Sequence, residues 1–247
     1  MKILILAAGY GTRLYPLIKD TPKSLLPIHG KPLINFILDK VQDLKGWDEI
    51  IVVTNNKFFN HFQEWAKKQP RLANKIRVVN DETNSPEDRL GSVGDIEFVL
   101  KKEKIKDDLL VVGGDNLFDY ELETYLSFAQ KKSPFATIGV FDIKNIEEAK
   151  KFGVVTLNRE QKVTAFEEKP STPKSSLIAM CFYYFPKESL NFLAQYIQLF
   201  KKADKAGDYI HWLSQQTNVY GFQFEGKWYD IGSIESYQEA QKAFSVK

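Results

Sequence analysis

The chain contains 247 residues, of which 43% are hydrophobic, so it can bury one sizeable α/β core and a single domain is the default expectation. Lysine and arginine number 34 against 32 aspartates and glutamates, which argues against a broad nucleic-acid surface and leaves any positive field local. Cys181 is the only cysteine, which excludes an internal disulfide and a cysteine-rich zinc cluster. Its apolar surroundings predict a place in the core.

The N-terminal sequence predicts a cytoplasmic protein. One lysine precedes a short apolar run that breaks at Gly9, and this run has neither a cleavage signal nor the length of a membrane span. We therefore expect no membrane contact.

Apolar strand candidates alternate with helical patterns over the first part of the chain. The expected strands are residues 3–6, 50–53, 76–79, 109–112 and 136–140, with amphipathic helices over 33–44 and 59–67. Alternation of this kind indicates βαβ crossovers, and so a mainly parallel sheet whose ligand lies at the carboxyl ends of the strands.

The remaining part of the chain has a different pattern. Strands are expected at 153–157, 163–167, 177–185 and 219–224, joined by turns, with helices at 187–200 and 233–244. The predicted fold class is therefore α/β and Rossmann-like, with a mainly parallel mixed sheet flanked by helices.

A glycine-rich loop follows the first strand, in the run Gly9-Tyr10-Gly11-Thr12-Arg13-Leu14. Gly9 and Gly11 let the backbone turn tightly and bring bare N–H groups up to an anion. Arg13 and Lys23 add two positive charges to the same region. The sequence therefore predicts a polyphosphate site.

Two other nucleotide-binding patterns fit this chain poorly. The second strand ends in Thr54-Asn55-Asn56, with no acid to hold a ribose, and no Gly-Lys-Ser/Thr follows the first glycines. An NAD-dependent enzyme and a Walker-type nucleotide site are therefore the less favoured interpretations.

Two aspartates are candidate metal ligands. Asp115 follows the buried strand 109–112, and Asp230 lies at the end of a late strand just before a helix. A carboxylate beside phosphates makes sense chiefly if Mg²⁺ lies between them. The alternatives are a turn-forming role for Asp115 and a carboxylate at a helix N-terminus for Asp230.

A longer signature includes the glycine-rich loop and the segments that follow it. The run Gly9-Tyr10-Gly11-Thr12-Arg13-Leu14-Tyr15-Pro16-Leu17, followed by Pro22-Lys23-Ser24-Leu25-Leu26-Pro27-Ile28 and Lys31-Pro32-Leu33-Ile34, closely resembles that of the sugar-1-phosphate nucleotidyltransferases, the glucose-1-phosphate thymidylyltransferase group in particular. The resemblance extends from Lys2 to about Ala240. It implies a fold of the nucleotide-diphospho-sugar transferase type in one domain, 1–247, with a nucleotide-binding half over about 1–120 and a sugar-binding half over about 121–247.

The resemblance also implies a reaction. A nucleotidyl group would pass from an NTP, with dTTP or UTP favoured, to a sugar 1-phosphate, with glucose 1-phosphate favoured, and pyrophosphate would leave. Arg13 would hold the pyrophosphate, Lys23 would face the α-phosphate, and Mg²⁺ would be held by Asp115 and Asp230. The residues expected to bind the nucleotide are Ala8, Gly9, Gly11, Thr12, Asn80, Gly91 and Gly114.

The sugar side rests on the segment Phe166-Glu167-Glu168-Lys169-Pro170. Alone, it is typical of a solvated strand end. The resemblance assigns Lys169 to the phosphate of the sugar 1-phosphate, and Glu168 and Gly153 to the hexose.

Some segments depart from the family pattern. Asn80 stands where relatives often have Gln, although its amide can still pair with a pyrimidine edge. Gly91-Ser92-Val93-Gly94-Asp95 replaces a Gly-Thr-Ala-Gly or Gly-Leu-Ala-Gln segment, and residues 81–89 are unusually acidic and polar. Ala179-Met180-Cys181-Phe182-Tyr183 replaces the usual Thr-Gly-Leu/Ile-Tyr. These departures bear on the choice of base and hexose.

The alternative function within the same fold is a non-catalytic regulatory subunit that binds a nucleotide sugar. Such a subunit would lose charged site residues, and here all five expected ones are present: Arg13, Lys23, Asp115, Lys169 and Asp230. We therefore expect an enzyme whose partners are an NTP and a sugar 1-phosphate, with no nucleic acid or membrane. A homo-oligomer is left open.

Overall fold

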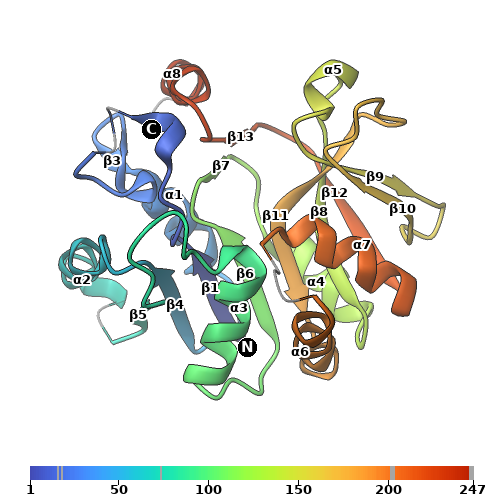
Figure 1. Ribbon diagram of the computed structural model, residues 1–247, viewed down its shortest axis with the longest axis horizontal. Coiled ribbons are helices and arrows are strands. Elements are labelled where there is room, and N and C mark those ends of the chain that lie inside the picture. The colour runs from blue at the N-terminus through green and yellow to red at the C-terminus, as the bar shows by residue number, and fades with distance from the viewer. Residues whose placement is uncertain (16, 18, 73, 201–203, 245–247) are drawn as a thin grey trace. The chain divides into compact units, whose positions relative to one another are not determined.

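The computed structural model describes residues 1–15, 17, 19–72, 74–200 and 204–244, so Pro16 of the signature lies outside the described residues. The chain divides into two compact units, each built from segments that are discontinuous in sequence (Figure 1). The first unit contains Met1–Arg89, Val112–Leu122 and Gly226–Lys247, and the second contains Leu90–Val111 and Glu123–Glu225. In the part of the chain that the structure describes, no helix is long and apolar enough to cross a membrane.

Three parallel strands form the centre of the first unit. They are β1 (Lys2–Leu6), β4 (Glu49–Thr54) and β5 (Ile76–Asn80), paired in the order β1, β4, β5. The middle residues of β1 and β4 are fully buried, as expected for parallel strands covered on both faces. All three strands confirm the predicted segments, each extended by one or two residues. Their carboxyl ends lie at the same edge of the sheet.

Helices and short turns complete the first unit. In α1 (Leu33–Val41) the buried residues recur every three to four positions, and α2 (Phe59–Lys67) packs against β4 and β5. The predicted helix over 33–44 ends at Val41, whereas the predicted helix over 59–67 is confirmed. The other short elements are the 3₁₀ turns η1 (Thr12–Leu14), η2 (Lys23–Leu25) and η3 (Pro70–Leu72) and the strands β2 (Pro27–Ile28) and β3 (Lys31–Pro32).

A small antiparallel pair belongs to the same unit. It joins β7 (Asn116–Phe118) to β13 (Trp228–Asp230), and α8 (Ile234–Ala243) follows directly. Ser233 begins α8 with a reciprocal cap, because its side chain accepts from the Ser236 N–H while Ser236 Oγ accepts from the Ser233 N–H. The expected late strand and helix are thus confirmed, and β7 supplies the partner strand.

The second unit contains a mixed sheet. Its strands pair in the order β12 (Val219–Phe224), β8 (Ala136–Asp142), β11 (Leu177–Phe185), β9 (Gly153–Leu157) and β10 (Val163–Glu168). β12 and β8 are parallel, and the other pairs are antiparallel. This confirms the mixed character predicted for the later part of the chain.

The strand β6 (Leu109–Gly113) belongs partly to each unit, since the boundary between the units falls after Val111.

Helices and aromatic rings form the core of the second unit. α7 (Ala206–Gln216) packs on β10 and β12, and α4 (Glu123–Lys131) packs on β8 and β12. The ring centroids of Tyr125 and Phe182 are 5.0 Å apart, and those of Phe222 and Phe224 are 4.9 Å apart. The expected helix 187–200 begins as a 3₁₀ turn, η4 (Lys187–Ser189), before α6 (Leu190–Leu199). The remaining helices are α3 (Gly91–Lys102) and α5 (Ile146–Ala149).

Candidate active site

The predicted polyphosphate loop leaves β1 at the carboxyl edge of the three parallel strands. Gly11 has φ 59° and ψ 27°, the left-handed region that glycine adopts readily, and it begins η1, which carries Thr12 and Arg13. A Cβ at Gly9 would meet no atom of the described residues within 4 Å, so the backbone there borders open space among them. We call residues 7–11 the phosphate loop.

Lys23 and Asp115 form an ion pair. Lys23 begins η2, its Nζ donates to Asp115 Oδ2, and the two side chains are only 16% and 26% exposed. Burial lowers the pKa of Lys23, whereas the charges of Asp115 and Asp230 raise it and outweigh both burial and the opposing charge of Arg13. The net pKa lies above its ordinary value, so Lys23 carries a positive charge at neutral pH.

The second predicted metal ligand lies beside the first. The β7–β13 pairing places Asp230 opposite Asn116, and the Ile231 N–H donates to the Asp115 carbonyl at 3.0 Å. Trp228 Nε1 donates to Asn116 Oδ1 at 2.7 Å, and Asn116 Nδ2 donates to Asp115 Oδ1 at 3.1 Å. Asn116 therefore links the two strands and orients the Asp115 carboxylate.

Two further glycines lie close to the charged side chains or to the strand ends that carry them. Arg13 Nη2 and Asp230 Oδ2 each lie 3.5 Å from the position of a Cβ on Gly232, which places the guanidinium close to this carboxylate. A Cβ on Gly114 would lie 2.7 Å from Ser24 Oγ and 2.8 Å from the Leu6 carbonyl oxygen. Gly114 thus lets the end of β6 approach the end of β1.

The two carboxylates suit a magnesium ion whose coordination shell is completed by substrate phosphates. Mg²⁺ in proteins is usually held by one or two carboxylates together with waters and substrate phosphates. Asp115 and Asp230 supply two such carboxylates, and among the described residues no group of three or more His, Cys, Asp or Glu forms a closed metal site. The pair therefore suits a substrate-associated cation rather than a structural one.

The predicted sugar residues gather in the second unit. Glu168 pairs with Gly153 across β10 and β9, and a Cβ on Gly153 would lie 2.5 Å from Phe166 Cζ. Lys169 has φ 48° and turns the chain away after β10, where its N–H donates to the Phe152 carbonyl at 3.0 Å. The structure therefore places Gly153, Glu168 and Lys169 side by side.

The Glu168 carboxylate is partly withdrawn from solvent. Burial raises its pKa, Lys169 and Lys205 lower it, Asp208 raises it, and the net pKa lies above its ordinary value. Glu168 Oε2 occupies the space that a Cβ on Gly207 would take. Gly207, in the first turn of α7, is a residue that sequence reasoning missed, because nothing in its local sequence indicates a contact with β10.

The two residues expected at the nucleobase have other contacts. Asn80 Nδ2 donates to Asn56 Oδ1 at 3.0 Å, and Asn80 Oδ1 accepts from the Glu82 N–H at 2.8 Å. Gly91 has φ +77°, and the Cα of Asp204 lies 2.5 Å from the position of its missing Cβ. Asn80 belongs to the first unit and Gly91 to the second. Their roles at the base stay predictions.

Sequence reasoning also missed the role of Asn55 and Asn56, the two asparagines that follow β4. The Asn55 side chain is fully buried, and its Nδ2 donates to the Ala8 carbonyl of the phosphate loop at 2.8 Å. Two adjacent asparagines directly after a buried strand were the available signal.

Cys181 is half-buried, so its prediction as a core residue was wrong.

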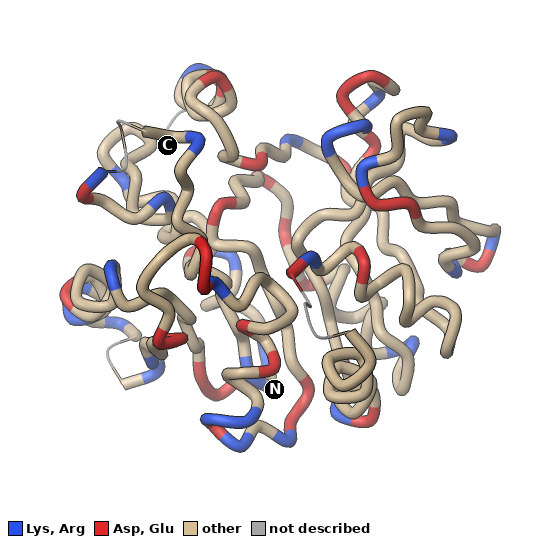
Figure 2. Tube along the Cα trace, in the orientation of Figure 1, with Lys and Arg blue, Asp and Glu red and all other residues tan. Residues whose placement is uncertain are grey.

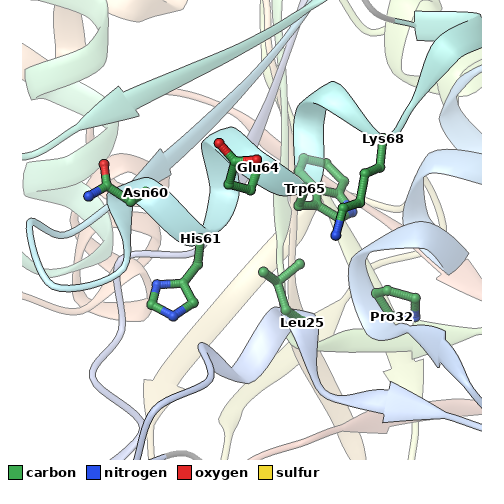
Figure 3. A pocket seen from close by; sticks show the side chains of 7 residues that line it. All are labelled: Leu25, Pro32, Asn60, His61, Glu64, Trp65 and Lys68. Carbon is green, nitrogen blue, oxygen red and sulfur yellow. The ribbon is translucent and has the colours of Figure 1, made fainter.

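A separate pocket of about 440 Å³ opens between η2 and α2 (Figure 3). It contains none of the predicted site residues, although Leu25 in its wall is the last residue of the turn that begins with Lys23. The charged, glycine-bordered region around Lys23 is the better candidate for phosphate chemistry. The lining residues are Leu25, Pro32, Asn60, His61, Glu64, Trp65 and Lys68.

The charges outside this region are interspersed. Figure 2 shows lysine and arginine scattered among aspartate and glutamate in both units. Such a mixture favours a local site for a small anion. The fold and the candidate site together define a class of protein, an α/β protein with a glycine-rich loop after its first strand and with paired cationic and acidic side chains beside it.

Comparison with known proteins identifies the family. The chain matches the family model for nucleotidyl transferases over residues 2–246, and it belongs to that family. It is 30% identical to the bifunctional protein GlmU of Methanocaldococcus jannaschii over 98% of this chain and 54% of the relative. It is 31% identical to a glucose-1-phosphate adenylyltransferase of Clostridium novyi over 97% of this chain and 65% of the relative. The chain thus spans between half and two thirds of the length of these relatives.

A solved structure supports the same fold. A protein of Bacillus anthracis, assigned as a glucose-1-phosphate thymidylyltransferase and crystallised with sucrose, matches with a TM-score of 0.85. The match covers 100% of this chain and 97% of that protein, at 21% sequence identity. The expected resemblance and the mixed, mostly parallel α/β fold are therefore confirmed.

Proposed function

We propose that this protein transfers a nucleotidyl group from an NTP to a sugar 1-phosphate and releases pyrophosphate. The observation that carries the proposal is the arrangement of Lys23, Asp115, Asp230 and Arg13 beside the phosphate loop. Two cations and two carboxylates beside the backbone N–H groups of the phosphate loop suit a reaction in which negative charge on phosphates must be held and neutralised.

The chemistry needs little from the protein beyond orientation and charge. An oxygen of the sugar 1-phosphate attacks the α-phosphorus of the NTP in line, and this oxygen is already anionic, so no general base is required. Lys23 faces the α-phosphate, and Arg13 holds the leaving pyrophosphate. A Mg²⁺ held by Asp115 and Asp230 would supply charge neutralisation at the reacting phosphates when bound.

The second unit supplies the acceptor side in this proposal. Lys169 restrains the phosphate of the sugar 1-phosphate, which lowers the entropic cost of bringing the two substrates together. Glu168 accepts hydrogen bonds from hexose hydroxyls, and Gly153 lets the sugar ring lie close to the backbone. We propose glucose 1-phosphate as the acceptor.

The nucleotide is proposed as dTTP or UTP. The Asn80 amide has both a donor and an acceptor, which suits a pyrimidine edge. dTTP and UTP differ in a ring methyl and a ribose hydroxyl. In a site not built around these groups, each changes the free energy of binding by only about 1–3 kcal/mol. Both nucleotides should therefore be used, and purine nucleotides poorly.

A matrix of the common NTPs against sugar 1-phosphates, with Mg²⁺ and scored by pyrophosphate release, tests the proposal. We expect release with UTP and dTTP and loss of release on adding EDTA. A preference for ATP, as the name of the Clostridium novyi relative would suggest, would overturn the pyrimidine assignment alone. No release in any pair would favour the alternative, a non-catalytic subunit that binds a nucleotide sugar.

A further inference from the structure

Buried side chains tie two loops of the first unit together. The phosphate loop follows β1, and residues 81–89, which we call the acidic loop, follow β5. Tyr10, Thr83 and Asp81 are 7%, 5% and 3% exposed. The Tyr10 hydroxyl oxygen lies 3.2 Å from Thr83 Oγ1, which donates to Asp81 Oδ1 at 2.8 Å.

The direction of these hydrogen bonds follows from their chemistry. Thr83 Oγ1 donates to Asp81 Oδ1, so the Thr83 hydroxyl uses its one hydrogen there. The Tyr10 hydroxyl must then donate to Thr83. Asp81 Oδ1 also accepts from the Thr83 N–H at 2.8 Å, so this carboxylate fixes both the backbone and the side chain of the residue that holds Tyr10.

A second link runs through the asparagines after β4. Asn55 Nδ2 donates to the Ala8 carbonyl at 2.8 Å, and the Asn56 N–H donates to the Thr83 carbonyl at 3.0 Å. The two loops are therefore joined on both sides, at Ala8 through the asparagines and at Tyr10 through its hydroxyl. Buried networks of this kind rigidify the segments they join.

The phosphate loop needs such support because of its glycines. Gly9 borders open space and Gly11 is left-handed, so each residue beside Tyr10 adds conformational freedom rather than stiffness. The Tyr10 side chain is the anchor between them. Losing its hydrogen bond would let the backbone N–H groups on either side move away from the positions in which they meet an anion.

We propose that Tyr10, Thr83 and Asp81 are positioning residues through which the acidic loop holds the phosphate loop in its anion-binding shape. The inference rests on the proposed function in placing the polyphosphate of the NTP at the phosphate loop. Its consequence is specific: a substitution in the acidic loop weakens the binding of a ligand that has phosphates and no base.

Inorganic tripolyphosphate with Mg²⁺ is the probe, and calorimetric titration of the whole chain is the measurement. Thr83→Val keeps the shape of the side chain and removes the hydroxyl, and Tyr10→Phe removes the donor. We expect each variant to bind tripolyphosphate about 5- to 10-fold more weakly, as for the loss of one buried hydrogen bond. The double variant should be no weaker than Thr83→Val alone, because Tyr10→Phe removes an interaction that the loss of the Thr83 hydroxyl has already removed.

Two controls separate this role from a general loss of structure. Thr83→Ser keeps the hydroxyl and should bind the probe like the wild type. Tyr125→Phe removes a buried tyrosine hydroxyl in the second unit, where it donates to the Thr137 carbonyl at 2.9 Å, and should leave the affinity unchanged. Melting temperatures of all variants show that each is folded at the temperature of the titration.

The outcomes distinguish this inference from the proposed function. Tripolyphosphate affinity that is unchanged in Thr83→Val, or losses that multiply in the double variant, would overturn the inference even if the wild type is an active transferase. Equal losses in Tyr125→Phe would overturn it too. A wild type that binds tripolyphosphate but releases no pyrophosphate with any substrate pair overturns the proposed function and leaves the inference in place.

Discussion

The candidate phosphate site in the first unit is held by charge, whereas the candidate sugar site in the second unit is held by close packing around glycines. Lys23 is paired with Asp115, with Asp230 and Arg13 nearby. Gly153 instead leaves room for the Phe166 ring, and Gly207 leaves room for the Glu168 carboxylate. The difference shows which substitutions each site should tolerate least. The phosphate site should lose activity when a charge is removed, and the sugar site should lose affinity when side-chain volume is added.

The largest effect is expected from removing a carboxylate in the first unit. Asp115→Asn keeps the shape of the side chain but removes the charge that pairs with Lys23 and would hold the cation. We expect kcat for pyrophosphate release to fall by about 10³-fold or more, with the fold retained. Full activity in this variant would contradict the metal assignment, and thermal melting checks that the loss is not unfolding.

The loss of the paired lysine should cost somewhat less. Lys23→Ala removes the charge that meets the α-phosphate as negative charge builds up, so kcat should fall by about 10²–10³-fold, as for one preorganised donor. Lys67→Ala is the matched control, since Lys67 pairs with Glu64 at 2.6 Å on an exposed helix face. Similar losses in both variants would mean that charge acts at long range and not at the site.

The structure shows why the charged residues were easier to predict than the packing around them. The glycines and Asp115 follow strands that hydrophobic runs define, so sequence pattern alone indicates a common edge. Arg13 and Lys23 follow the glycines in short turns. Asp230 was a candidate from its place before a helix, but its approach to Asp115 could not be predicted, because it depends on the β7–β13 pairing between distant segments.

Other contacts could not be predicted, because they join residues with no shared pattern. Gly207 meets Glu168 only after α7 packs on β10, and Gly91 meets Asp204 only after the start of α3 approaches a segment far along the chain. The hydrogen bonds of Asn80 likewise depend on Asn56, which follows a different strand. Tertiary packing of this kind leaves no periodic signal in a sequence.

A substitution on the sugar side should act on one substrate. Lys169→Ala should raise KM for the sugar 1-phosphate by about 10- to 100-fold, as for a lost charge-assisted contact, with little change in KM for the NTP. Lys174→Ala is the control, because Lys174 is 81% exposed and lies 3.5 Å from Glu167. Equal effects on both substrates would show that Lys169 is misplaced.

Added volume should sharpen the contrast between the sites. Gly207→Ala places a methyl group where Glu168 Oε2 lies, so the carboxylate must move, and we expect KM for the sugar 1-phosphate to rise by about tenfold. Shortening the acid in the double variant Gly207→Ala/Glu168→Asp should relieve the clash and recover part of that loss. The double variant being worse than Gly207→Ala alone would refute the steric account.

The smallest effect concerns stability against pH. The raised pKa of Glu168, caused first by burial and then by the charge of Asp208, means that the folded protein holds this proton more tightly than the unfolded chain. The contribution of Glu168 to stability should therefore fall as pH rises from about 4.5 through the raised pKa. Glu168→Gln should lose less stability than the wild type over this range, measured by denaturant unfolding at several pH values. A parallel pH dependence in the two proteins would argue against a raised pKa.

The discontinuous make-up of the first unit has a consequence for biosynthesis. Gly226–Lys247 packs with Met1–Arg89, so a nascent chain leaving the ribosome has β1, β4 and β5 long before it has β13 and α8. Asp230 arrives with that late segment, so Lys23 and Asp115 are synthesised well before their acidic neighbour. A chain that stops before Gly226 would carry the glycine-rich loop and both members of this pair, yet it would lack the second carboxylate. Translation has to pass residue 230 before the site can hold its full set of charges.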